Sequence, residues 1–182
     1  MILGIDIGNK GAIALIDGNE IVDIIDMPVS NNSIYHNKGG KPALIVDSVK
    51  LSNYLTSIIS KVDFAVIEEP ITPFNKTPQS IVNVSKNNVG YGMVRACIEI
   101  NGIEFHNVKP AKWKKALGVS ADKQSSIDAC HNIFHNSNNF VNKKKHDGRA
   151  EACLIGCFGY KIIKVLDKPS LQCYSKVTNN RI

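Results

Sequence analysis

The sequence has no apolar run long enough to cross a membrane, since no stretch of about eighteen apolar residues occurs in its 182 residues. Met1 leads directly into a strand-like run, without the basic and apolar segments of an export signal. The cysteines are odd in number and form no CxxC pair, which argues against a disulfide framework or a thiolate zinc site; they are Cys97, Cys130, Cys153, Cys157 and Cys173. We therefore expect an intracellular protein with reduced thiols and no membrane association.

Acidic residues are the minority charge, with 16 Asp and Glu against 22 Lys and Arg, a net charge of +6 and a sequence pI near 9.0. A basic balance suits a polyanionic partner such as nucleic acid, although many soluble proteins carry a similar charge. The 43% hydrophobic and 21% charged content argues against wholesale disorder, a collagen-like fibre or a coiled coil. One globular domain is expected from this length.

The N-terminal third predicts a meander of strands followed by a helix. Residues 2–8, 11–17 and 20–27 are rich in β-branched residues, and Asp17-Gly18-Asn19 is a turn signal between the last two runs. Three antiparallel strands are therefore expected. Residues 28–42, with their Pro, Asn and Gly content, predict a loop, and the apolar spacing in 45–59 predicts a helix.

The rest of the chain predicts two more strands and four helices. Gly90-Tyr91-Gly92 falls within one of these helices and indicates close packing or a break, because glycine costs a helix about 1 kcal/mol relative to alanine. The strands are expected at 63–69 and 103–108, and the helices at 80–101, from Pro110, at 121–135 and at 146–165. We predict a single domain over residues 1–168 and a weakly patterned tail over 169–182.

Asp6 is an acid within the apolar run ILGIDIG. Strand alternation places it on the face opposite Ile5 and Ile7. A buried carboxylate needs a compensating partner, which makes Asp6 a candidate catalytic or metal-binding residue. The alternative is an aspartate that caps the strand end or its turn.

Glu68 and Glu69 end the run DFAVIEE, just before Pro70. Alternation turns the two side chains to opposite faces, so only one of them can point where Asp6 points. Periodicity by itself does not choose between them. A solvated strand end is the alternative interpretation.

Asp147 and Glu151 lie four residues apart on a predicted helix and therefore share one of its faces. Two like charges at this spacing repel unless a cation lies between them, although such acidic pairs are also common on exposed helices. Three separate segments thus contribute carboxylates, and oxygen ligands of this kind suit Mg²⁺ or Mn²⁺ in phosphodiester hydrolysis.

Basic residues bracket the acidic helix. They could hold phosphates beside a negative site, or they could form an ordinary solvated face. The candidates are Lys109, Lys112, Lys114, Lys115, Lys123 and Arg149. Trp113, among these lysines, is expected to anchor the core.

Four motifs together resemble the RuvC-type Holliday junction resolvases, particularly their phage and viral branch. They are GIDIG, VIEEP, VKPAKWKKALG with ADKQS, and HDGRAEACLIG, and the resemblance covers residues 1–165. It implies an α/β fold of the ribonuclease H-like type, with a five-stranded mixed sheet, three antiparallel strands then two parallel ones, flanked by helices. It also implies metal ligands at Asp6, Glu68, Asp147 and Glu151, and contacts of Lys109 and Lys123 with the DNA backbone.

The sequence departs from the family's bacterial members at two places. Their last helix usually carries two aspartates three residues apart, whereas Asp147 and Glu151 are four apart. His146 is therefore an alternative ligand beside Glu151, or a residue that orients water. The aromatic residue that follows the family's glutamate is replaced by Pro70-Ile71, which leaves Phe74 as the candidate wedge at a junction centre.

The resemblance implies a homodimeric endonuclease that uses Mg²⁺, with Mn²⁺ able to substitute, and makes paired nicks in four-way DNA junctions. It would act in the cytoplasm of a bacterial or virus-infected cell. The nearest alternative is a nuclease for forks or flaps with the same carboxylates. More distant alternatives are an actin-like ATPase or sugar kinase, suggested by GIDIGNKGAIALID, and a junction-binding protein without activity.

Overall fold

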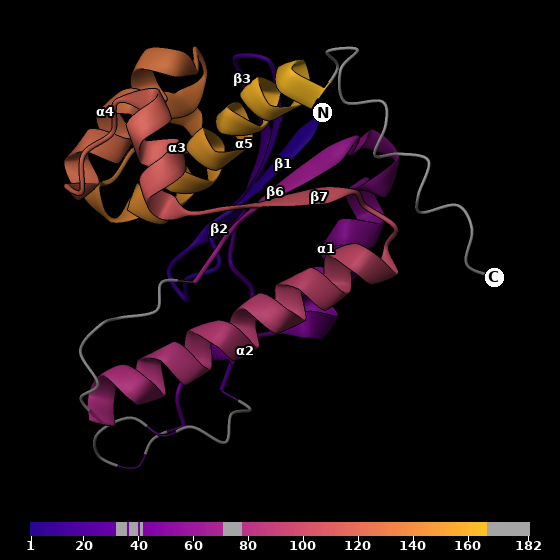
Figure 1. Cartoon of the computed structure of the whole chain (residues 1–182), viewed down its shortest axis with the longest axis vertical. Coiled ribbons are helices and arrows are strands. Elements are labelled where there is room, and N and C mark those ends of the chain that lie inside the picture. The colour runs from indigo at the N-terminus through magenta and orange to yellow at the C-terminus, as the bar shows by residue number, and fades with distance from the viewer. Residues whose placement is uncertain (32–35, 37–39, 41, 71–77, 167–182) are drawn as a thin grey trace.

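A five-stranded mixed sheet forms the centre of the protein, with helices on both faces (Figure 1). The structure, a computed structural model, describes residues 1–31, 36, 40, 42–70 and 78–166, with the backbone alone for 78–82 and 161–166. The predicted tail at 169–182 and the candidate wedge Phe74 lie outside the described residues. No helix within the described ranges is long and apolar enough to span a membrane.

The sheet has the predicted topology, with strand order β3-β2-β1-β6-β7. β1 pairs antiparallel with β2, and β2 with β3, whereas β1–β6 and β6–β7 are parallel. Gly18, at φ +57°, forms the turn between β2 and β3 in a conformation that glycine adopts without strain. The strands are β1 (Ile2–Ile5), β2 (Ala12–Asp17), β3 (Glu20–Asp26), β6 (Phe64–Glu68) and β7 (Phe105–Val108).

One face of the sheet is covered by α1 (Ser48–Ile58), the short 3-10 helix η1 (Ile59–Lys61) and α2 (Pro78–Ile100). Large aliphatic side chains from both layers form this core, among them Leu3, Ile5, Ile67, Leu51, Leu55 and Ile98, all fully buried. Burial of such side chains is worth about 1.5–3 kcal/mol each, so the α1 and α2 face is an ordinary aliphatic core.

Two expectations for this region were wrong. The helix predicted from residue 45 begins at Ser48, because the Asp47 side chain caps it by accepting the Lys50 N–H at 3.1 Å. Residues before the cap form β5 (Ile45–Val46), which pairs with β4 (Val29–Ser30) inside the predicted loop. Of the two alternatives at residues 90–92, the structure shows close packing: α2 is continuous, and a Cβ at Gly90 would lie 3.2 Å from Val46.

The other face of the sheet is covered by α5, with α3 and α4 packed beside it (Figure 1). Pro110 occupies the first turn of α3, and Gly118, at φ +69°, ends that helix. Cys97, Cys130, Cys153 and Cys157 form no disulfide bond within the part of the chain that the structure describes. The elements on this side are α3 (Pro110–Leu117), α4 (Lys123–Ile133), the 3-10 helices η2 (Ser137–Asn139) and η3 (Lys144–His146), and α5 (Asp147–Leu166).

α5 lies directly on the backbone of β1 and of the turn after it. A Cβ at Gly4 would lie 2.1 Å from the Ala152 carbonyl oxygen and 2.4 Å from the Gly156 nitrogen. A Cβ at Gly148 would lie 2.1 Å from the Lys10 carbonyl oxygen. These approaches are possible only for glycine, and they hold the first turn of α5 beside the carboxyl end of β1.

Candidate active site

The pairing of β1 with β6 brings Asp6 and Glu68 together. Gly4 pairs with Val66 and Ile5 with Ile67. Asp6 and Glu68, the residues that come next along the chain, therefore lie side by side. Alternation then places Asp6 and Glu68 on the face covered by α5, and it turns Glu69 to the other face. The strand register therefore selects Glu68, a choice that periodicity left open.

Asp6 is held by the short turn that follows β1. Its Oδ1 accepts the Gly8 N–H at 3.1 Å, and its own N–H donates to the Ala12 carbonyl at 3.0 Å. A Cβ at Gly11 would lie 2.8 Å from the Asp6 carboxyl carbon, so the turn closes over the acid only because residue 11 is glycine. Burial, and then the charges of Glu151 and Asp147, raise the pKa of Asp6 to about 6 against the opposing Gly8 hydrogen bond.

Glu68 is held by the buried tryptophan of α3. Trp113 is fully buried and its Nε1–H donates to Glu68 Oε1 at 2.8 Å. Burial and the neighbouring charge of Asp6 raise the pKa of Glu68 to about 7, while the Trp113 hydrogen bond and the Lys114 charge act in the opposite direction. Trp113 thus has the expected core position and also a polar role that the sequence did not reveal.

Two lysines hold the acids of α5. Lys114 Nζ lies 2.8 Å from Glu151 Oε1, and the buried Ser126 hydroxyl donates to the same oxygen at 3.1 Å. Lys123 forms an ion pair with Asp147. Both acids lie close enough to Asp6 for their charges to raise its pKa. The roles of Lys114 and Ser126 depend on long-range packing and had no sequence signal.

His146 faces a different part of the molecule from the carboxylates. Its Nδ1 accepts the Asn142 N–H at 3.4 Å, and its side chain lines a pocket together with Asp26 and Arg149. Burial and the Arg149 charge lower its pKa. The structure thus brings Asp147, and not His146, to the side of Asp6.

The predicted DNA-binding residues divide into two groups. Lys109, Lys112 and Lys115 are exposed on or just before α3, and Lys123 is 71% exposed despite its ion pair. Arg149, in contrast, is occupied by Asp26, with Nε–Oδ1 at 2.6 Å and Nη2–Oδ2 at 2.8 Å. Lys109, Lys112 and Lys115 can meet a phosphate backbone directly and Lys123 by leaving Asp147, whereas Arg149 ties α5 to the end of β3.

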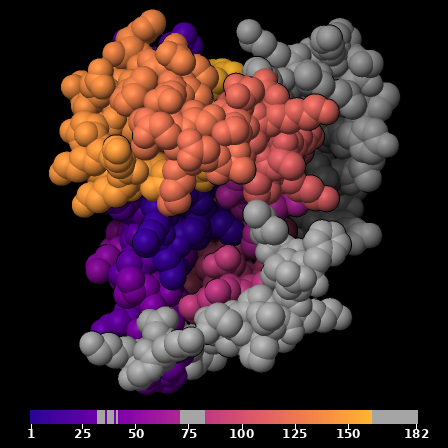
Figure 2. All heavy atoms as spheres, turned by 90° about the vertical axis from the view of Figure 1, so that its left-hand side faces the viewer, coloured from indigo at the N-terminus to yellow at the C-terminus, as the bar shows by residue number. Residues whose placement is uncertain are grey.

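The four carboxylates therefore lie on the same face of the sheet, toward the carboxyl ends of β1 and β6, where Figure 1 shows α3 and the start of α5. Figure 2 views this side of the molecule, where the indigo N-terminal segment reaches the surface directly below the orange atoms of the α4 region. Within the described residues no three His, Cys, Asp or Glu side chains form a ready-made metal cluster. Glu68, Asp147 and Glu151 instead point to Trp113 and the two lysines.

The donor set nevertheless fits a divalent cation. All four groups are carboxylates, the donors preferred by Mg²⁺ and Mn²⁺. Asp6 and Glu68 have raised pKa values because burial disfavours their charged forms, as do the charges of Glu151 and Asp147 on Asp6 and of Asp6 and Glu151 on Glu68. Lys114 and Lys123 already place ammonium groups against two of the acids. A bound cation would relieve the same excess of negative charge.

Sequence comparisons gave no relative, since neither a protein-family model nor a curated protein matches the chain. Solved structures do match it in fold. "T. thermophilus RuvC in complex with Holliday junction substrate" has a TM-score of 0.58 at 11% identity, covering 90% of this chain and 95% of that one. A second Thermus thermophilus RuvC structure has a TM-score of 0.51 at 13% identity, covering 88% and 95%.

A fowlpox virus Holliday junction resolvase has a TM-score of 0.49 at 14% identity, covering 91% of this chain and 98% of that one. The two RuvC structures show the fold: a RuvC-like, ribonuclease H-like α/β fold over most of the chain, as the motifs had implied.

Proposed function

We propose that this protein is a metal-dependent, structure-selective DNA endonuclease that resolves four-way junctions by paired nicks. The observation that carries the proposal is the group of four carboxylates, Asp6, Glu68, Asp147 and Glu151, within a fold shared with a RuvC bound to a Holliday junction substrate. The exposed lysines of α3 and α4 beside this group supply the positive charge that DNA needs.

Asp6, Glu68, Asp147 and Glu151 would hold the metal, Mg²⁺ with Mn²⁺ as a substitute. Divalent cations in a carboxylate site of this kind supply an activated water and stabilise the charge on the leaving oxygen. Asp147 and Glu151 can turn toward a cation without refolding, since the groups that hold them are the side chains of Lys123, Lys114 and Ser126.

The chain's own residues position this chemistry. Trp113 donates a hydrogen bond to one oxygen of Glu68, and the Gly8 N–H donates one to an oxygen of Asp6. These two acids are therefore held in place before substrate binds. Lys114 is half-buried against Glu151 and lies 5.1 Å from the Trp113 ring centroid, which keeps a positive charge inside the acidic group. Lys109 and Lys123, both exposed, are suited to neutralise phosphates on either side of the cut.

Paired nicks need two active sites, because one carboxylate group cuts one strand. We propose a homodimer whose two-fold axis coincides with that of the junction. Light scattering of the free protein and of its junction complex tests this: two protein chains per junction are expected, and a single chain would contradict the dimer.

Cleavage of defined DNA tests the function directly. Purified protein is incubated with a labelled four-way junction, a fork, a flap and a linear duplex, in Mg²⁺, in Mn²⁺ and in a chelator, and the nicks are mapped. Symmetric nicks in the junction alone, absent in the chelator, are expected. Preferred cutting of forks or flaps would support the alternative nuclease, and binding without cutting in either metal would support an inactive junction-binding protein. ATP turnover without DNA cleavage would overturn the proposal.

A further inference from the structure

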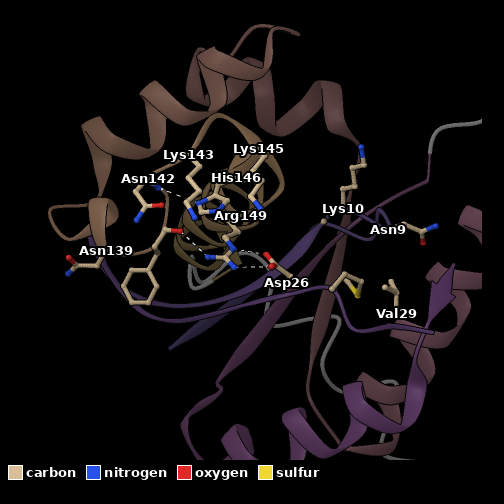
Figure 3. A pocket seen from close by; sticks show the side chains of 13 residues that line it. Asn9, Lys10, Asp26, Val29, Asn139, Asn142, Lys143, Lys145, His146 and Arg149 are labelled. Carbon is tan, nitrogen blue, oxygen red and sulfur yellow. Dashed lines mark hydrogen bonds and ion pairs between the residues drawn. The ribbon is translucent and has the colours of Figure 1, made fainter. Parts of the chain in front are cut away.

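A pocket of about 630 Å³ lies beside the carboxylates, on the other side of the turn that follows β1 (Figure 3). It is lined by that turn, by the end of β3 and by the segment from Asn139 to Arg149. Its described lining includes none of the four carboxylates. Its volume is within the usual range for a small-molecule site and exceeds what a lone phosphate would need.

The turn forms a shared wall between the pocket and the carboxylates. Gly11 lines the pocket, and a Cβ on it would lie 2.8 Å from the Asp6 carboxyl carbon. On the opposite side, His146 lines the pocket and the next residue, Asp147, faces Asp6. The pocket and the carboxylates are thus separated only by this turn and by the start of α5, so a nucleotide next to a phosphate at the carboxylates is the part of a DNA strand best placed to enter the pocket.

The pocket is built on a rigid base. Arg149 donates two hydrogen bonds to Asp26 and a third, at 3.2 Å, to the Phe140 carbonyl. In Figure 3 the Arg149 side chain points directly at Asp26, below His146 and the lysines. This contact joins the end of β3, the start of α5 and the segment between η2 and η3, and it neutralises the one carboxylate of the lining that the structure describes. Asp26 therefore does not repel an anionic ligand.

Three further lysines give the pocket an excess of positive charge. Lys10, Lys143 and Lys145 line it and are exposed, and none of them forms an ion pair with any residue that the structure describes. Figure 3 shows Lys143 and Lys145 on one side of the pocket and Lys10 on the other. Charges on two sides of a cavity suit a ligand with phosphates at two ends.

The remaining lining suits a nucleobase. Phe140 packs partly against the core beneath α5 and lines the pocket with the rest of its surface, and Asn139 and Asn142 offer amide groups that can both donate and accept hydrogen bonds. Proteins that bind unstacked bases combine these features: an aromatic surface for the base, amides for its edge and lysines for its phosphates.

We propose that this pocket binds one nucleotide of the cleaved strand, unstacked from its neighbours and adjacent to the scissile phosphate, with lysines at its phosphates and Phe140 against its base. The inference rests on the proposed function, because the strand must lie at the carboxylates. It assigns to the pocket a role in selecting the cleavage position, since extruding a base costs unstacking energy and base pairs at the branch point have an interrupted stack.

The test uses four-way junctions that carry the fluorescent base 2-aminopurine at single positions around the mapped nick, in a chelator that prevents cleavage. With the wild-type protein we expect a fluorescence change at one flanking position only. The double variant Lys143→Ala/Lys145→Ala should lose that change, bind the junction at least about tenfold more weakly and lower the slope of log K against log salt by about 1.8 for two contacts.

Lys144→Ala is the matched control, because Lys144 is an exposed neighbour of both lysines and does not line the pocket. It should behave as wild type. Phe140→Leu should keep the salt slope and lose the fluorescence change, and Lys143→Arg/Lys145→Arg should restore affinity. Thermal unfolding of each variant checks that the fold is intact.

Two results overturn the inference, and they are distinguishable. If the wild type cuts junctions and the pocket variants match Lys144→Ala in affinity, salt slope and fluorescence, the pocket holds no nucleotide while the proposed function stands. If the wild type neither binds nor cuts any branched DNA, the proposed function and the inference both fail.

Discussion

The two faces of the sheet are packed in different ways. On the face of α1 and α2, large side chains such as Leu51, Leu55 and Ile98 separate the helices from the strands. On the face of α5, glycines let the helix backbone touch the strand backbone, with Gly4 against Ala152 and Gly156. All four carboxylates of the candidate site belong to the second face.

This difference shows how the fold positions its acids. A layer of flexible aliphatic side chains can adjust by a few tenths of an ångström, whereas contact between two backbones cannot. Because Gly148 is seated on the Lys10 carbonyl, the first turn of α5 has one possible position relative to Asp6. The α5 face therefore carries the precise geometry, and the α1 and α2 face supplies bulk stability.

The largest expected effect is loss of cleavage when an acid of the α5 face is neutralised. Asp6→Asn and Glu68→Gln should each lower the rate of junction cleavage at least about a thousandfold, because cation-assisted stabilisation is worth several kcal/mol and each 1.36 kcal/mol is tenfold in rate. Junction binding should persist, since the lysine contacts remain. Single-turnover cleavage and a binding assay give the two numbers.

Glu69→Gln is the matched control, since alternation turns Glu69 to the other face. It should keep most of the activity. A result with Glu69→Gln inactive and Glu68→Gln active would mean that the catalytic glutamate is not the one paired with Asp6.

The next largest effect is on stability. Gly4→Ala should lower the free energy of unfolding by about 3 kcal/mol or more, because its Cβ would lie 2.1 Å from a backbone oxygen that cannot move. Gly92→Ala, in α2 with no atom within 4 Å of its Cβ, should instead raise it by about 1 kcal/mol. Urea unfolding measures both, and equal effects would show that the two faces do not differ as described.

The free energy of unfolding should depend on pH in opposite directions for the acids of the α5 face and for the acid that caps α1. Asp6 and Glu68 have pKa values near 6 and 7 in the folded protein, against 3.8 and 4.5 ordinarily. Between these values the folded state holds more protons than the unfolded state, so the free energy of unfolding falls as pH rises from 4.5 to 7. Without metal, Asp6→Asn or Glu68→Gln should therefore raise stability at pH 7.5, by on the order of 2 kcal/mol.

Asp47, the cap of α1, provides the contrast. Its hydrogen bonds with Lys50 lower its pKa, so its contribution is present at neutral pH and is lost as pH falls through the folded pKa. Asp47→Asn should reduce the fall in the free energy of unfolding at acidic pH. It should leave the slope of that free energy between pH 4.5 and 7 unchanged. Urea unfolding of the three variants across this pH range gives the comparison, and an Asp6→Asn protein with the wild-type slope would contradict the raised pKa.

The smallest effect concerns recognition. If Lys109 and Lys123 each neutralise a phosphate, Lys109→Ala or Lys123→Ala should weaken junction binding for all sequences and lower the salt slope by about 0.9 per contact in each subunit. Lys50→Ala, an exposed lysine of α1, should leave the slope unchanged. Affinities at five salt concentrations test this, and parallel lines for all four proteins would remove both lysines from the DNA site.

Much of the fold could be predicted because its signals are local. Alternation and the turn at Gly18 indicated the β2–β3 hairpin, and helical spacing indicated α1, α4 and α5. The start of α1 was missed because Ile45 and Val46 continue its apolar pattern yet pair with β4. The sequence left open whether Gly90 marks close packing or a break in α2, and its close approach to Val46 in a continuous helix decides for close packing.

The candidate site could be predicted only as a set of acids. Asp6, Asp147 and Glu151 were selected by local arguments, an acid in an apolar strand and two acids four residues apart. Arg149 was grouped with the DNA-binding residues from its charge, and the structure places it against Asp26 instead. A basic residue's partner depends on which distant segment packs beside it, and no local pattern contains that information.

The sequence by itself determined the order of the elements and the types of residue that end them, because hydrophobic period, turn residues and caps act within a few positions of the chain. Only the tertiary structure decided which acids meet. The parallel register of β1 with β6 placed Glu68 beside Asp6, and the packing of α3 brought Trp113 and Lys114 to Glu68 and Glu151. These contacts join residues 37 or more positions apart, and such pairings are set by the packing of whole elements.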